Sequence, residues 1–197
     1  LGGISAFNVT YNFGSGTTTV TANTGWVMRT NLVGTASQSL RFSIPQNIVN
    51  GACDTALATT VTDVMWDPDA TNPNGVVAVG NWTTTGTPAA TYSFLAKLNS
   101  NLDVVAIRTL VPSSNVNLTA QAIVRSVGGT GYSVFGTMGA APNVTVSMLT
   151  FPYNLGGFPS VDDGFYVLDA GTGAAMNMSF GDVVVESNRY VVLGAGT

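Results

Sequence analysis

The apolar residues of this chain fall in short runs that turn-forming residues separate. Residues 64–82 read V-M-W-D-P-D-A-T-N-P-N-G-V-V-A-V-G-N-W, two apolar runs around a loop of Asp, Asn, Pro and Gly. Short runs rich in β-branched residues, bounded by such loops, are typical of strands joined by turns. The pattern therefore predicts an all-β chain.

The same arrangement recurs twice along the chain. Residues 123–138 read I-V-R-S-V-G-G-T-G-Y-S-V-F-G-T-M, and residues 183–194 read V-V-V-E-S-N-R-Y-V-V-L-G. In each copy a glycine lies near or at the end of the second run, and these glycines, Gly80, Gly136 and Gly194, are 56 and 58 residues apart. A fixed period of this length indicates a repeat architecture.

A second half-motif follows the first. Residues 94–110, F-L-A-K-L-N-S-N-L-D-V-V-A-I-R-T-L, predict two strands joined by an Asn-Ser-Asn turn. We interpret residues 165–180 as another copy of it and residues 26–45 as a weaker one. The chain is therefore expected to be a single repeat array over 1–197, or a fragment of a larger one, with four-strand units at 1–50 (partial), 60–115, 118–181 and 182–197 (partial).

Four short antiparallel strands per unit resemble the short β-propeller repeats of secreted and cell-surface proteins. Residues 75–80 and 94–99 carry this resemblance. It implies a β-propeller-like array of four-stranded blades with a period of about 60 residues. Because closed propellers have about four to eight blades, the ring would be completed by other protein chains or by the rest of a longer chain. A β-sandwich is the alternative, since its strands recur without a blade-level period.

Charge excludes several classes of function. Only 8% of residues are charged, the net charge is −4, and the six basic residues are scattered singly, which excludes a nucleic-acid surface. No run of about 18 apolar residues is present, so no membrane span is predicted. Solubility must then come from hydroxyl and amide groups or from glycans, which is typical of extracellular or cell-surface proteins.

The chain offers little catalytic chemistry. Without histidine, Ser-His-Asp and Cys-His systems and histidine-ligated zinc are excluded. Asp162 and Asp163 are adjacent, so on a strand their carboxylates would point to opposite faces, and a turn explains them better. Cys53 is the only cysteine, so it either pairs with a cysteine outside these residues or stays a free thiol. We therefore predict no enzyme.

One loop could hold a metal ion. Ca²⁺ takes six or more oxygen ligands from flexible loops, and carboxylates and amides gather within a few residues of the first loop, at Asp67, Asp69, Asn72 and Asn74. The competing interpretation is that Asp, Asn, Pro and Gly are simply what tight turns contain. Calcium is the only cofactor that the sequence suggests.

Glycans enter the predictions in two ways. Sequons for N-glycosylation occur at Asn8, Asn81, Asn117, Asn143 and Asn177. Trp82 is a candidate for stacking on a sugar, although indole rings more often pack between sheets.

Three functional hypotheses follow. The first is a non-catalytic extracellular or cell-surface structural and interaction module, part of a larger protein or assembly. The alternative is a carbohydrate-binding, lectin-like propeller that uses tryptophan at loop ends. The third is a polysaccharide-active enzyme whose carboxylates, from Asp67, Asp69, Asp162 and Asp163, come from separate blades.

Overall fold

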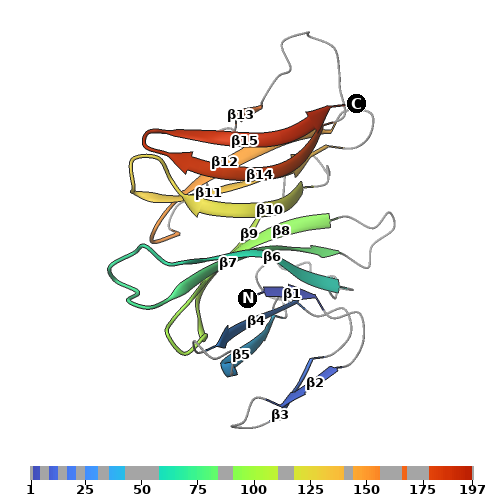
Figure 1. Ribbon diagram of the computed structural model, residues 1–197, viewed down its shortest axis with the longest axis vertical. Helices are drawn as coiled ribbons and strands as arrows, with labels where there is room; N and C mark the ends of the chain where they lie inside the picture. Colours follow the sequence, from blue (N-terminus) through green and yellow to red (C-terminus); the bar gives the residue numbers. More distant parts are fainter. Residues whose placement is uncertain are drawn as a thin grey trace.

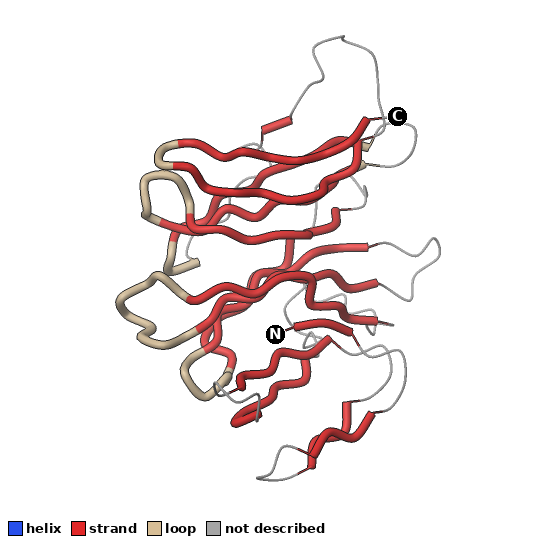
Figure 2. The backbone as a smooth tube through the Cα atoms, viewed as in Figure 1, coloured by secondary structure: helices blue, strands red, loops and turns tan. Residues whose placement is uncertain are grey.

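The regular structure of this chain is entirely β-strand. The computed structural model describes residues 2–4, 9–12, 17–20, 25–30, 36–42, 58–83, 91–110, 118–139, 144–155, 166–167 and 178–196. Within these ranges there is no helix (Figure 2), and every strand pairing is antiparallel. It follows that no helix of the described part could cross a membrane.

The strands form four successive sheets and one separate hairpin. Sheet I contains β1 (Gly2–Ile4), β4 (Gly25–Thr30) and β5 (Ala36–Phe42), and the hairpin contains β2 (Val9–Asn12) and β3 (Thr17–Val20). Sheet II contains β6 (Ala58–Trp66), β7 (Val76–Thr83), β8 (Thr91–Leu98) and β9 (Val104–Leu110). Sheet III contains β10 (Leu118–Arg125), β11 (Gly131–Met138), β12 (Thr145–Pro152) and β13 (Tyr166–Val167). Sheet IV contains β14 (Met178–Glu186) and β15 (Arg189–Gly196), and no sheet closes on itself among the described strands.

The repeated glycines occupy the same place in three sheets. Gly80 pairs with Val61, Gly136 with Ala120 and Gly194 with Phe180. In every case the first strand then contains a β-bulge, so that the next paired residue is two positions further on. A bulge adds one unpaired residue and bends its strand. Sheets II, III and IV therefore begin with the same bulged hairpin in the same register.

The bulge explains why glycine is needed there. A Cβ at Gly80 would collide with the carbonyl oxygen of Thr60, and one at Gly136 with that of Thr119. At Gly194 the carbonyl oxygen of Ser179 takes the same position. In each sheet the colliding oxygen belongs to the residue just before the glycine's pairing partner, so one backbone geometry excludes side chains at all three positions.

The sheets stack face to face in chain order, I to IV, as Figure 1 shows from β4–β5 to β14–β15. Side chains of alternate strand positions fill each interface. Sheets I and II meet through Val27, Val61, Ala78, Phe94 and Leu98; sheets II and III through Val77, Val79, Leu95, Ala120, Ile123, Tyr132 and Phe151; and sheets III and IV through Ala122, Phe135, Val146, Phe180 and Val183. Sheets II and III thus bury both of their faces.

Two details of the expected repeat differ from the structure. The counterpart of β8 is β12, since Phe94 pairs with Gly80 as Ser147 pairs with Gly136. The proposed copy at residues 165–180 is therefore wrong, because β13 is a fourth strand and β14 already belongs to the next sheet. For the same reason, sheet IV starts at Met178 and not at residue 182. The weaker copy at residues 26–45 overlaps two paired strands, β4 and β5, in sheet I.

Replacing Gly136 by alanine tests the role of the bulge. The new Cβ would press on the Thr119 carbonyl in the middle of a buried hairpin. We expect the G136A variant to lose about 2–3 kcal/mol of unfolding free energy in urea titrations, as overpacked sites do. Gly181 is the matched control, because it is exposed and its Cβ would find its nearest neighbour at 3.3 Å. Equal losses from G136A and G181A would contradict the explanation.

Candidate functional site

The loop between β6 and β7 is held by its own short hydrogen bonds. Asp67 Oδ1 accepts a bond from the Asp69 amide at 2.9 Å, and Asp69 Oδ1 accepts one from the Thr71 amide at 2.9 Å. The amides of Asn72 and Gly75 donate to carbonyls three residues earlier, each at 3.0 Å. These are the turns that Asp and Asn side chains favour.

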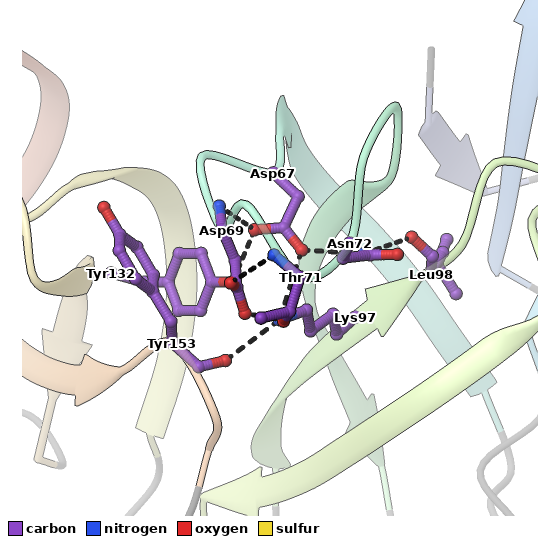
Figure 3. A network of polar contacts seen from close by, with 8 residues as sticks. All are labelled: Asp67, Asp69, Thr71, Asn72, Lys97, Leu98, Tyr132 and Tyr153. Carbon is purple, nitrogen blue, oxygen red and sulfur yellow. Dashed lines mark hydrogen bonds and ion pairs between the residues drawn. The ribbon is translucent and has the colours of Figure 1, made fainter.

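The side chain of Lys97 reaches this loop from β8. Its Nζ lies 3.4 Å from Asp67 Oδ2, forms an ion pair with Asp69 Oδ2, and donates to the Tyr153 carbonyl at 3.1 Å (Figure 3). The side chain of Asp67 is fully buried and that of Lys97 is 6% exposed. The only lysine of the chain therefore supplies the positive charge for the carboxylates of the loop.

Further donors complete the surroundings of Asp67. The Tyr132 hydroxyl donates to its Oδ1 at 2.6 Å, and the Asn72 side-chain amide donates to its Oδ2 at 2.7 Å. Asn72 Nδ2 also donates to the Leu98 carbonyl at 2.9 Å. Tyr132 belongs to β11 of sheet III, whereas Lys97 belongs to β8 of sheet II and the other members lie in the loop between β6 and β7. We call Asp67, Asp69, Asn72, Lys97 and Tyr132 the inter-sheet polar cluster.

The pKa values of two of its members reflect these contacts. The hydrogen bond from Lys97, with those from the Thr71 amide and hydroxyl, holds the pKa of Asp69 below its ordinary value of 3.8. Burial, reinforced by the hydrogen bond to Asp67, raises the pKa of the Tyr132 hydroxyl, which therefore remains a donor. The cluster is thus a lysine ion-paired with ionised aspartate, and a neutral tyrosine closes it.

The four residues proposed as calcium ligands are only partly brought together. Asp67 and Asp69 converge, but on the Lys97 ammonium, and Asn72 presents its amide nitrogen, a donor, to Asp67. The backbone carbonyl oxygen of Asn74 accepts a bond from the Arg29 guanidinium at 2.6 Å. Among the described residues, no group of three His, Cys, Asp or Glu could hold a metal ion. The positive charge beside Asp67 and Asp69 is that of the Lys97 ammonium.

Sequence reasoning missed Lys97 and Tyr132. The available signal was the single lysine inside the apolar run F-L-A-K-L, because a lysine is almost never fully buried unless it is paired. That position should have pointed to the acidic loop one strand away. Tyr132 gave no comparable signal.

Asn81, a predicted glycosylation site, lies between sheets II and III. Its Nδ2 donates to the Ala120 carbonyl at 2.9 Å, and its Oδ1 accepts from the Ala120 amide at 2.7 Å and from the Ser93 hydroxyl at 2.8 Å. The nitrogen that would carry a glycan is therefore used within the stack.

Trp82, the predicted sugar-stacking residue, is 4% exposed. Its ring packs 5.1 Å from that of Tyr92, and its Nε1 is buried with no acceptor among the described residues. In this arrangement the indole offers no ring face to a sugar. Other predicted positions lie outside the described residues, namely Asn8, Cys53, Asn117, Asn143, Asp162, Asp163 and Asn177.

Comparison with protein-family models, with curated proteins and with solved structures finds no match to this chain. Its function must therefore be argued from its own residues.

The K97M substitution tests what holds the cluster together. It leaves the buried Asp67 carboxylate without a positive charge, and removing one partner of a buried ion pair costs about 3–5 kcal/mol. We expect this loss in the free energy of unfolding by urea. The matched control is R189M, which breaks the exposed pair with Glu186 and should cost less than about 1 kcal/mol. Similar losses in both variants would show that Lys97 is not a structural cation.

The N81A substitution tests the second polar contact between sheets II and III. It leaves the buried Ala120 carbonyl with one donor fewer and should cost about 1–3 kcal/mol of unfolding free energy. Gln121 provides the control, because it is exposed in the neighbouring bulge and Q121A should change little.

A separate measurement addresses glycosylation of Asn81. Protein from a secretory host should carry no glycan on Asn81, because its side-chain nitrogen is bonded within the stack. A glycan found there by peptide mass in the folded protein would contradict this packing.

Proposed function

We propose that the chain is part of a β-propeller-like array and serves as a non-catalytic structural and interaction module of an extracellular or cell-surface assembly. The observation that carries the proposal is the stack itself. Three sheets begin with the same bulged hairpin, and successive sheets pack face to face through apolar side chains. A propeller is built by radial repetition of four-stranded sheets, and two of the described sheets, II and III, have four strands.

The use of the polar residues supports a non-catalytic role. The densest group of titratable side chains in the described part, the inter-sheet polar cluster, is buried, and its members bond to one another. Asp63, another half-buried carboxylate, accepts bonds from the Val64 and Ile123 amides, and burial raises its pKa. These groups hold sheets together, whereas a general acid or base must reach a substrate.

Exposed apolar side chains support a role in interaction. Among the residues that the structure describes, seven large hydrophobic side chains are exposed, and four of them, Val184, Val185, Val191 and Leu193, lie on sheet IV. Apolar surface that is exposed on one sheet marks contact sites with other protein. The low charge of the chain supports the extracellular location.

Cell fractionation and cross-linking test this function. The protein should be recovered from the cell surface or the medium, and cross-linking should convert it to a species heavier than the 20.2 kDa chain. The reagent should couple carboxyl groups, because the only lysine is buried in the stack and amine reagents would not reach it. An uncross-linked monomer inside the cell would contradict the proposal. So would turnover of a polysaccharide that D162N or D163N abolishes without altering the fold.

A further inference from the structure

Each sheet of the stack presents one face to the sheet that follows it, which we call its leading face. Register identifies the equivalent positions on the first two strands of sheets II, III and IV. In sheet II they are Asp63, Met65, Val77 and Val79; in sheet III, Ala122, Val124, Ser133 and Phe135; and in sheet IV, Asp182, Val184, Val191 and Leu193.

The first two leading faces are covered in the same manner. Val77 and Val79 are fully buried against sheet III, and Met65 packs beside them. Phe135 is buried against sheet IV, where its ring packs 5.1 Å from that of Tyr190, and Ser133 exchanges a 2.6 Å hydrogen bond with the Tyr190 hydroxyl. The covering element is in both cases the bulged hairpin that begins the next sheet.

The leading face of sheet IV is also apolar, but no described sheet covers it. Val184 and Val191, which pair with each other, are 59% and 52% exposed, and Leu193 is 66% exposed. Val184 and Val191 occupy the register positions of Met65 and Val77, and Leu193 that of Val79. Isolated exposed valines need no explanation, but three apolar side chains at positions that sheet II buries do.

Asp182 adds a directional group to this face. In sheet II, Asp63 Oδ1 accepts the Val64 amide at 2.8 Å, and its Oδ2 accepts the Ile123 amide of sheet III at 2.9 Å. Asp182 is the register equivalent of Asp63, and its Oδ1 accepts the Val183 amide at 2.8 Å in the same way. No described residue donates to Asp182 Oδ2. The oxygen that anchors a following strand in sheet II is thus present and open in sheet IV.

We infer that the leading face of sheet IV is a docking surface for a further β-sheet of the same repeat. The first strand of that sheet would place small or β-branched side chains, as Ala120 and Ile123 do, against Val184, Val191 and Leu193. One of its backbone amides would donate to Asp182 Oδ2. This inference rests on the proposed function, since it names the kind of partner that the interaction module takes.

The test uses a peptide with the sequence of residues 118–138, the hairpin that covers the leading face of sheet II. It is titrated into the full 197-residue chain while the methyl NMR signals of the chain are followed. The signals of Val184, Val191 and Leu193 should shift together, whereas those of Val104, which is 48% exposed on sheet II, should not. The matched control peptide carries aspartate at the positions of Ala120 and Ile123 and should not bind.

Two variants of the chain test the carboxylate and the apolar part of the surface separately, and a third is the control. Because a hydrogen bond to a charged group is worth about 1.5–3 kcal/mol, D182A should weaken peptide binding about tenfold or more. L193K should abolish it, and V104K should leave it unchanged. All of these residues are exposed, so the variants should unfold at the same urea concentration as the original chain.

Three outcomes would overturn the inference. The native peptide shifts none of the three methyl signals, or the control peptide binds equally well, or the chain without peptide sediments as an oligomer that L193K dissociates. The last result would assign the face to a second copy of the chain. If the peptide does not bind but cross-linking yields a heavier species at the cell surface, the docking inference fails and the proposed function stands. If the peptide binds but the chain is an uncross-linked monomer inside the cell, the proposed function fails and the docking surface stands.

Discussion

The arrangement of the stack depends on a close approach between a strand carbonyl and a glycine. The bulge bends the first strand so that its carbonyl lies where a side chain of the second strand would begin, at Gly80, Gly136 and Gly194. Because side chains of a strand alternate between faces, the bulge also decides which residues face the preceding sheet and which face the next one. One local geometry therefore sets the contacts on both sides of a sheet.

Polar contacts add specificity to interfaces that are otherwise apolar. Apolar faces can slide past one another at little cost, whereas the bonds of Asn81 to Ala120, Asp63 to Ile123 and Tyr132 to Asp67 each fix one relative position of sheets II and III. Lys97 adds a further contact of this kind, since its Nζ also donates to the Tyr153 carbonyl beside β12, whereas its ion pairs with Asp67 and Asp69 lie within sheet II and its loop. Register between sheets is thus determined by a few polar side chains.

Sequence patterning predicted the all-β class, the strands of sheet II and the glycines that mark each hairpin. It failed at β12 because the residues F-L-A-K-L-N that mark the end of β8 do not recur there. The two whole strands, T-Y-S-F-L-A-K-L and T-V-S-M-L-T-F-P, share only the pattern T-x-S-x-L. The loop at Asp67 was singled out for its composition, but composition cannot reveal that the balancing charge comes from another strand of the same sheet.

The absence of backbone pairing between the described sheets has a consequence for the way the molecule opens. The apolar clusters of the described residues lie between successive sheets, so the stability of a sheet combines its own pairing with the terms from one or two interfaces. Sheets II and III have two such interfaces, whereas sheet IV has one among the described residues. Amide hydrogens of β14 and β15 should consequently exchange with solvent through local opening events that leave β7 and β11 closed.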